Sequence, residues 1–518
     1  MAEELDVENT IAGRREWVGL AVLALPCFLL AMDLTVLHLA VPSISAQMKP
    51  SSAQLLWIVD IYGFMIAGSL ITMGTLGDRI GRRKLLLTGG AAFGVASVAA
   101  AFSTTPGMLI ATRALLGVAG ATLMPSTLAL IRNMFHNPRQ RTTAIAFWLN
   151  SFMIGGAVGP LLGGFMLEHF WWGSVFLLNV PVMAMLIALG PFLLPEFRDR
   201  NAGRLDLLSA ALSLVAILAV IYGIKQAAQD GLGVVSISTI AAGIAIGAVF
   251  VARQKKLSEP LIDLRLFSIP AFGASVTTQL VALLAMAGIY FFVAQYFQLV
   301  LGLSPLTAGL WLLPSTAAGM IGSFLTPALG RRLRPGHVVG GGLVIAALGM
   351  IMLAGVSSAG LALVVTGQVV ISAGLNPTMT MTTDLILGVA PPDRAGAASA
   401  ISETSCELGL ALGLAILGSV GTASYRRIMA ADALAGIPTA EVDAARGTLG
   451  GALEVAERIG AGGEALSALA RSAFTQSLAL VSAISAAIVL ATAIFAIVRL
   501  RGIPIRAEPA QREMSAAA

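Results

Sequence analysis

Five ionisable side chains lie inside long apolar stretches of the sequence, where a charge has chemical consequences. They are Asp33, Asp60, Arg113, Glu403 and Glu407. A charged side chain at the centre of a bilayer costs roughly 2.5 to 3.5 kcal/mol on insertion scales, so such groups pair with one another or line a wet cavity. The excess of acids over the single arginine suits protons and organic cations. Structural pairing alone is the alternative interpretation of this set.

Asp33 and Arg113 form a candidate proton site. Burial favours the neutral form of a carboxylate, whereas a nearby guanidinium favours the charged form. We expect Asp33 to bind the proton, with Arg113 modulating its affinity as a cavity opens to alternate sides of the membrane. A static ion pair between the two residues is the alternative.

Glu403 and Glu407 are four residues apart, so they share one face of a helix. Two close carboxylates tend to share a proton, and an entering cation could then displace that proton. We expect Glu407, nearer the helix centre, to act in both proton coupling and substrate binding. Glu403 either joins it in substrate binding or supports local structure near the inner end of the helix.

Asp60 lies beside Trp57 and Tyr62, near the outer end of its apolar stretch. It is either a cation contact on the release side or an interfacial residue. Aromatic faces attract cations, which makes several aromatic side chains candidates for a lipophilic substrate pocket. For each of them, packing or a place in the interfacial aromatic belt is the alternative. These candidates are Trp57, Tyr62, Trp148, Phe291 and Trp311.

The composition identifies the elements that must position these residues. Of 518 residues, 57% are apolar and only 11% are charged, less than half the roughly 25% charge of soluble domains. With a mean hydropathy of +0.88, this excludes a soluble protein and indicates an all-α integral membrane protein. Apolar stretches long enough to span a bilayer predict fourteen helices. They lie at 17–41, 54–76, 85–103, 107–131, 142–166, 173–194, 206–225, 235–252, 271–294, 305–328, 337–355, 361–386, 396–422 and 474–499.

The basic residues predict the orientation of these helices. Most of them fall on one side if both termini are cytoplasmic, as the positive-inside rule requires. The short outer loops then hold only Lys49 and Lys225. The net charge of +5 therefore reflects topology, and we expect no nucleic-acid partner. Cys27 and Cys406 lie in apolar stretches, which supports neither a disulfide nor a metal site.

Basic turns after the second and tenth predicted helices indicate two six-helix halves, the usual repeat of secondary transporters. The sequence has no GxxxxGK[ST] motif and no arrangement of a nucleophile with a base. We therefore expect no enzyme and no cofactor, the proton motive force being the energy source. The predicted segments are an N-terminal bundle (1–200), two inserted helices with linkers (201–270), a C-terminal bundle (271–500) with a long extracellular loop (423–473), and a cytoplasmic tail (501–518).

Several motifs resemble those of one family. Residues 74–84 (GTLGDRIGRRK) resemble the loop signature between helices two and three of the major facilitator superfamily. Residues 113–117 (RALLG) and 155–164 (GGAVGPLLGG) are similar to its helix-four motif and its antiporter motif. Residues 32–42 (MDLTVLHLAVP) resemble the signature of fourteen-helix drug:proton antiporters. The stretches WIVDIY at 57–62 and ETSCELG at 403–409 resemble the subgroup that exports quaternary ammonium compounds and methyl viologen.

The resemblance implies the major facilitator fold and proton-coupled multidrug efflux by alternating access, in a bacterial inner membrane. The exported compounds would be small lipophilic cations such as quaternary ammonium compounds, dyes and biocides. The other partners would be protons and membrane lipids, and the protein would be monomeric. The alternative is a specific exporter of an endogenous metabolite, siderophore or lipid. The predicted helix 305–328 lacks the extra acid of some relatives, which makes handling of divalent cations less expected.

The resemblance also implies that two motifs control conformation. The loop signature would stabilise the outward-facing state, its aspartate accepting hydrogen bonds from a helix N-terminus and its arginines pairing across the two halves or with anionic lipid. The antiporter motif is either a hinge or a stripe of small residues for close helix packing. The conformational residues are Gly74, Asp78, Arg79, Gly81, Arg82, Arg83, Gly155, Gly159, Pro160, Gly163 and Gly164.

Overall fold

The computed structural model is helical throughout the part of the chain that it describes, as predicted. Within that part there is no strand. The predicted cytoplasmic tail beyond position 503 lies outside the described residues. So do residues 430–438 and 461–462 of the predicted outer loop. The described residues are 11–198, 206–231, 233–257, 260, 262–356, 360–391, 395–429, 439–460 and 463–503.

Fourteen helices among the described residues are long and apolar enough to cross a bilayer, which confirms the predicted number. Several extend beyond their apolar cores. The first, α2, runs from Arg14 to Met48 rather than over 17–41, and ends where Lys49 adopts a left-handed backbone conformation. Hydropathy marks the segment in lipid, whereas capping residues and turns mark where the helix itself ends.

One compact unit, here unit 1, takes in Met1–Leu261, Gly302–Leu310 and Met429–Ala470. Within it α2 packs along α6, α3 along α5 and α9, and α4 along α5 and α8. The predicted insert thus groups mainly with the N-terminal helices. The helices are α2 (Arg14–Met48), α3 (Ser52–Ile80), α4 (Arg82–Ala101), α5 (Pro106–Met134), α6 (Pro138–His169), α7 (Ser174–Leu177), α8 (Asn179–Leu193), α9 (Leu207–Asp230) and α10 (Val234–Gln254).

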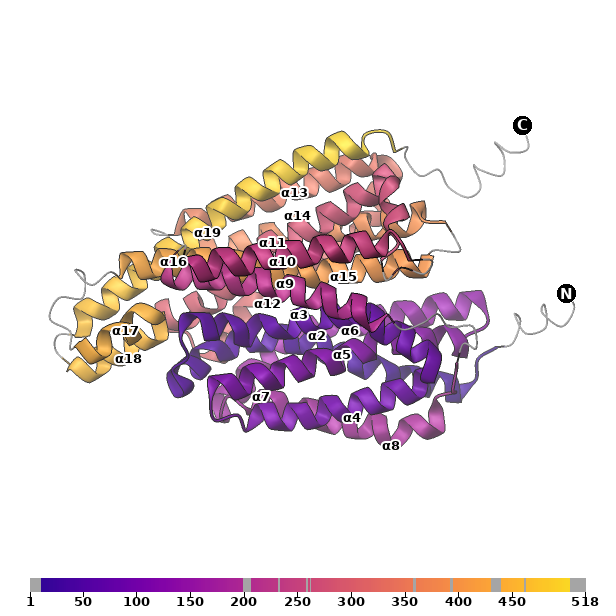
Figure 1. Ribbon diagram of the computed structural model, residues 1–518, viewed down its shortest axis with the longest axis horizontal. Coiled ribbons are helices and arrows are strands. Elements are labelled where there is room, and N and C mark those ends of the chain that lie inside the picture. Colours follow the sequence, from indigo (N-terminus) through magenta and orange to yellow (C-terminus); the bar gives the residue numbers. More distant parts are fainter. Residues whose placement is uncertain are drawn as a thin grey trace, which may run out of the picture. The chain divides into compact units, whose positions relative to one another are not determined.

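The other compact unit, unit 2, takes in Ile262–Leu301, Trp311–Ile428 and Arg471–Ala518. Here α13 packs along α14, and α11 packs along both α14 and α15; Figure 1 labels these helices. Two helices, α12 and α19, begin in unit 1 and continue in unit 2. The helices that lie wholly or mostly in unit 2 are α11 (Pro270–Gln295), α12 (Pro305–Arg332), α13 (Pro335–Ala354), α14 (Gly360–Val389), α15 (Ala395–Gly413), α16 (Ser419–Ile428) and α19 (Gly463–Leu500), with a 3-10 turn at Leu264–Ser268 and π-helical turns at Tyr296–Val300 and Leu414–Gly418.

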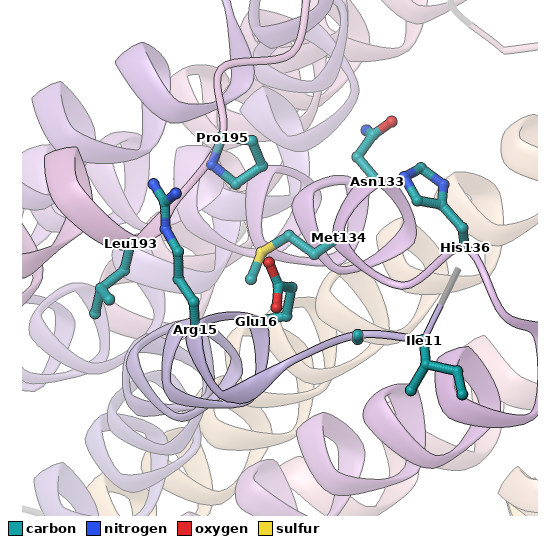
Figure 2. A pocket seen from close by; sticks show the side chains of 9 residues that line it. Ile11, Arg15, Glu16, Asn133, Met134, His136, Leu193 and Pro195 are labelled. Carbon is teal, nitrogen blue, oxygen red and sulfur yellow. The ribbon is translucent and has the colours of Figure 1, made fainter. Parts of the chain in front are cut away.

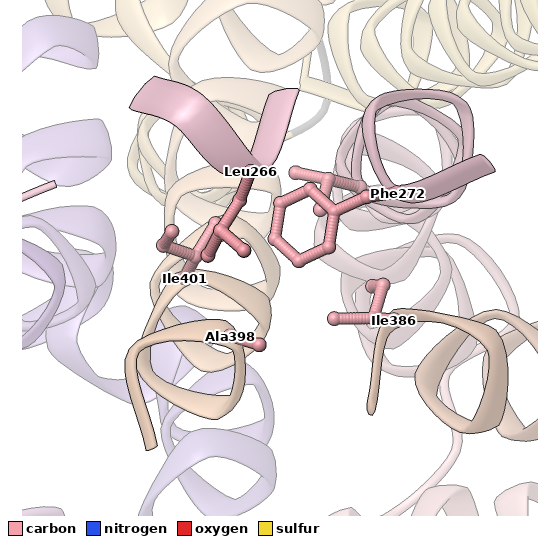
Figure 3. Packing of buried hydrophobic residues seen from close by; sticks show 6 residues of the cluster. Leu266, Phe272, Ile386, Ala398 and Ile401 are labelled. Carbon is pink, nitrogen blue, oxygen red and sulfur yellow. The ribbon is translucent and has the colours of Figure 1, made fainter. Parts of the chain in front are cut away.

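A hydrophobic cluster fixes one end of unit 2. Figure 3 shows Leu266 and Phe272 directed toward Ile386 of α14 and toward Ala398 and Ile401 of α15. All five are buried. The cluster joins the entry to α11 to the two neighbouring helices, one of which carries the predicted acids Glu403 and Glu407.

The inserted pair differs from the prediction at its outer end. Helix α9 continues to Asp230 and ends at Gly231, whose φ of +86° suits glycine. Lys225 is therefore inside a helix and buried, so its assignment to a short outer loop was wrong. The polar run that follows Lys225 extends the helix instead of ending it.

The predicted outer loop contains a helical hairpin. Its helices are α17 (Thr439–Gly447) and α18 (Leu449–Ile459), which pack on each other, and α18 also packs on α2. The Ser52 hydroxyl, at the start of α3, donates to the Gly447 carbonyl at 2.6 Å. The hairpin therefore belongs to unit 1, although the helices before and after it in the chain lie largely in unit 2.

Candidate transport sites

Asp33 and Arg113 meet in the interior of unit 1. Arg113 Nη1 of α5 donates to Asp33 Oδ2 of α2 at 2.6 Å, and both side chains are buried. The guanidinium also donates through Nε to the Ile58 carbonyl at 3.3 Å and lies 4.4 Å from the centre of the Tyr62 ring. The two residues predicted to handle the proton are thus in direct contact, and Arg113 has two further partners on α3.

Glycines let α6 approach α2 on both sides of Asp33. A Cβ at Gly155 would collide with the backbone of Phe28, and one at Gly159 with Thr35 and Met32. A Cβ at Gly163 would lie 2.6 Å from a methyl of Val36. The contacts advance by about one turn on both helices, so this stretch of α6 packs directly on the helix that carries Asp33.

Two further residues of the antiporter motif contact the first turn of α12, whose residues 305–310 belong to unit 1. A Cβ at Gly164 would lie 2.7 Å from the Cα of Leu306. Gly309 approaches the carbonyl of Pro160 too closely for any side chain. A Cβ would therefore meet a neighbouring helix at Gly155, Gly159, Gly163 and Gly164 of the motif.

Asp60 has a basic partner that the sequence interpretation missed. Lys225 Nζ of α9 donates to Asp60 Oδ1 at 2.9 Å, lies 2.8 Å from Oδ2, and sits 3.8 Å from the centre of the Trp57 ring. Asp60 is therefore paired within the protein. Tyr62, predicted to join Trp57 and Asp60, instead stacks on Arg113, since residues two apart on a helix face different directions.

Glu403 and Glu407 lie on α15 in unit 2. Gln279 of α11 contacts the residue that precedes each of them. The Gln279 amide donates to Cys406 Sγ at 2.8 Å and accepts from the Ser402 hydroxyl at 3.0 Å. Each of these partners precedes a glutamate by one residue, so both acids point about 100° round the helix from Gln279. Within the described residues, Glu407 Oε2 is buried and accepts no hydrogen bond. It can accept a proton or contact a cation.

The other aromatic candidates are placed differently from one another. Trp148 is buried and donates its indole N–H to Thr127 Oγ1 at 3.2 Å, while Phe291 is buried edge-on against Phe292. Trp311 of α12 is 40% exposed. Trp148 and Phe291 therefore have packing roles in this structure, whereas the exposed face of Trp311 can meet lipid or substrate.

The loop signature makes its described contacts inside unit 1. Asp78 accepts from Arg82 Nε at 2.8 Å, and Arg83 donates to the Leu194 carbonyl at 3.0 Å. The carboxylate of Glu196 accepts from the backbone N–H of Arg83 at 3.1 Å and leaves no room for a Cβ at Gly81. These contacts tie the loop to the segment that follows α8.

Two residues of the loop signature contribute less. Arg79 is exposed, as its predicted contact with anionic lipid requires. Gly74 has only an ordinary contact with Pro125.

A pocket of about 270 Å³ lies elsewhere in unit 1, at the predicted inner end. Figure 2 shows Arg15, Glu16, Asn133 and His136 around it, with none of the predicted substrate-binding residues. Glu16 accepts from the backbone N–H of Gly13 at 2.7 Å, so it caps α2. We assign this pocket no role in transport.

The comparisons agree with the motifs. Residues 23–414 match the Major Facilitator Superfamily. The chain is 44% identical over 481 residues to the multidrug efflux pump LfrA of Mycolicibacterium smegmatis, which covers 92% of this chain and 95% of that protein. It is 37% identical over 486 residues to the methyl viologen resistance protein SmvA of Salmonella typhimurium, with 92% and 97% covered.

Solved structures show the same fold. A bacterial homologue of the human lysosomal transporter Spinster superposes with a TM-score of 0.68 at 18% identity, covering 96% of this chain and all of that one. The fourteen apolar helices and these relatives indicate a multi-pass protein of a bacterial inner membrane. By its sequence match and its fold, the chain belongs to the major facilitator superfamily.

Proposed function

We propose that the protein is a proton-coupled multidrug efflux antiporter that exports lipophilic cations by alternating access. The observation that carries the proposal is the buried contact of Asp33 with Arg113 between two membrane helices. The relatives described as a multidrug efflux pump and a methyl viologen resistance protein support the substrate class.

In this mechanism a proton and Arg113 compete for the same carboxylate. With Asp33 ionised, the guanidinium neutralises it at 2.6 Å. When Asp33 takes up a proton, the attraction is lost, and Arg113 stays with the Ile58 carbonyl and the face of Tyr62. Asp33 lies on α2 and Arg113 on α5, and α2 also packs on the glycines of α6 on both sides of Asp33. A movement of α2 that separates the pair therefore also changes its contact with α6.

The cation is handled by the acids of α15. The buried Oε2 of Glu407 accepts no described hydrogen bond. An organic cation can therefore bind at this carboxylate in place of a proton. Glu403, one turn earlier, adds to the negative potential. One proton entering for each monovalent cation leaving is electrically neutral, whereas a second proton also uses the membrane potential, worth about 2.3 kcal/mol per charge per 100 mV.

The test is ethidium uptake into inverted membrane vesicles, with and without an uncoupler. We expect uncoupler-sensitive uptake by the wild type and its loss in Asp33→Asn. Asp206→Asn is the matched control, because Asp206 also pairs with an arginine, Arg253 at 3.0 Å, but at the end of the inserted helices; this variant should transport normally. Uptake that is insensitive to the uncoupler would refute proton coupling, and absence of wild-type uptake would refute multidrug export.

A further inference from the structure

The surroundings of the Lys225 ammonium are those of an organic-cation site. A carboxylate, Asp60, lies within 2.9 Å of Nζ through both of its oxygens, and the Trp57 ring faces the same nitrogen at 3.8 Å. The side chains of Lys225 and Asp60 are 2% and 0% exposed. A buried anion next to an aromatic face is how proteins recognise ammonium groups.

Asp60 and Trp57 are presented together by one helix. They are three residues apart on α3, so they lie on the same face. The cation comes from a different element, α9 of the inserted pair. Helix α3 alone therefore supplies the carboxylate and the aromatic ring of the site, and Lys225 supplies only the cation.

The inserted helices are attached to the bundle at few points. In the most apolar stretch of each helix, only 22% of α9 and 11% of α10 is buried. Along α3, Leu214 of α9 fills the space over Gly68, and Lys225 lies further toward the predicted outer end. Lys225 is thus a cation on a peripheral helix, and it reaches the α3 site through its own side chain.

We infer that Asp60 and Trp57 form a binding site for alkylammonium groups, that the ammonium of Lys225 occupies this site, and that Lys225 thereby determines whether an external cation can bind there. While Lys225 is in place, each of the acids Asp33 and Asp60 already has a basic partner. Cations in solution then have no unpaired carboxylate to bind at these two positions. The consequence for substrate selection rests on the proposed export of cations, whereas the site itself does not.

The binding test is chemical rescue of Lys225→Ala with n-propylammonium, which replaces the three carbons and the nitrogen removed by the substitution. Thermal unfolding of the purified protein is followed by tryptophan fluorescence. We expect millimolar n-propylammonium to raise the unfolding temperature of Lys225→Ala more than that of the wild type, as ligand binding to the folded state requires. Equal concentrations of sodium or of neutral n-propanol should have no such effect.

Three control variants define the site. Asp60→Asn/Lys225→Ala lacks the carboxylate and should show no rescue. Trp57→Leu/Lys225→Ala should bind n-propylammonium roughly 2- to 30-fold more weakly, the range expected for a cation–π contact. Lys49→Ala removes an exposed lysine from its ion pair with Glu454, and this variant should gain no affinity for n-propylammonium.

The outcomes separate the site from its role. Equal responses of Lys225→Ala and the wild type, or of Lys225→Ala and the double variant without Asp60, would overturn the site. If Lys225→Ala does not fold in plain buffer, its recovery as a monodisperse protein must require n-propylammonium, and failure of that recovery also overturns it. If n-propylammonium binds Lys225→Ala but does not inhibit its ethidium uptake, the role in substrate selection is refuted. Loss of wild-type ethidium uptake would refute the proposed function alone, because the thermal shift needs no transport.

Discussion

Alanine at Gly155 and at Gly156 should have opposite effects on stability, although the two glycines are adjacent in one motif. A Cβ at Gly155 would lie 2.9 Å from the carbonyl carbon of Phe28 and 3.0 Å from its Cα, with the carbonyl oxygen closer still. These are backbone atoms, which cannot rotate away, so α2 and α6 must separate. A Cβ at Gly156 meets nothing within 4 Å.

The magnitudes follow from these two environments. Overpacking of a close interface costs about 1 to 3 kcal/mol, which we expect for Gly155→Ala. Replacing an unhindered helical glycine by alanine stabilises by roughly 0.5 to 1 kcal/mol, which we expect for Gly156→Ala. The two variants should therefore differ by roughly 1.5 to 4 kcal/mol, with Gly155→Ala unfolding at a lower temperature than the wild type and Gly156→Ala at a slightly higher one.

Thermal unfolding of the purified variants, followed by tryptophan fluorescence, gives this order. Ethidium uptake by the same variants separates the two interpretations of the motif. If the glycines serve close packing, Gly156→Ala should take up ethidium at the wild-type rate. If they serve a hinge, uptake by Gly156→Ala should be slowed as well as uptake by Gly155→Ala, because alanine stiffens the backbone at either position. Unfolding of Gly155→Ala at or above the temperature of Gly156→Ala would refute the packing argument.

Three more predictions concern two of the ion pairs and Glu407, whose buried Oε2 accepts no hydrogen bond from the part of the chain that the structure describes. Asp33→Asn leaves the Arg113 guanidinium buried without its counter-charge and should destabilise the protein by about 3 to 5 kcal/mol. The double variant Asp33→Asn/Arg113→Gln should recover part of this loss in thermal unfolding. A double variant less stable than Asp33→Asn would contradict the pairing. Glu407→Gln should weaken ethidium binding and flatten its pH dependence, measured by fluorescence titration, and an unchanged titration would exclude Glu407 from proton and cation competition. Lys49→Ala removes an ion pair with Glu454 at an exposed lysine and should change the unfolding free energy by less than about 1 kcal/mol, so a larger loss would show that this pair holds the hairpin.

The sequence was sufficient for the class of fold and the number of membrane helices, because both follow from runs of apolar residues. It was also sufficient to predict contact between Asp33 and Arg113, since opposite charges in membrane-spanning segments tend to pair. The assignment of Lys225 failed at a helix end. Hydropathy falls after Lys225, but the helix continues until Gly231 supplies a positive φ, and that glycine was the available signal.

Side-chain partners were less predictable. Helical spacing alone separates Tyr62 from the face of Trp57 and Asp60, so this error could have been avoided. The contact of Gln279 with Ser402 and Cys406 joins residues more than 120 positions apart, and no local pattern indicates it. The same holds for the glycines of α6, whose spacing predicts a close neighbour but does not identify α2 as that neighbour.

The hairpin also sets an order of events during biosynthesis. Ser52 and its partner Gly447 are separated by 395 residues. At a synthesis rate of about 5 to 20 residues per second, the ribosome needs roughly 20 to 80 seconds between the two. During this interval the nascent N-terminal helices are in the membrane without the hairpin that packs on them, so unit 1, which begins first in synthesis, cannot be complete until most of unit 2 has also been made.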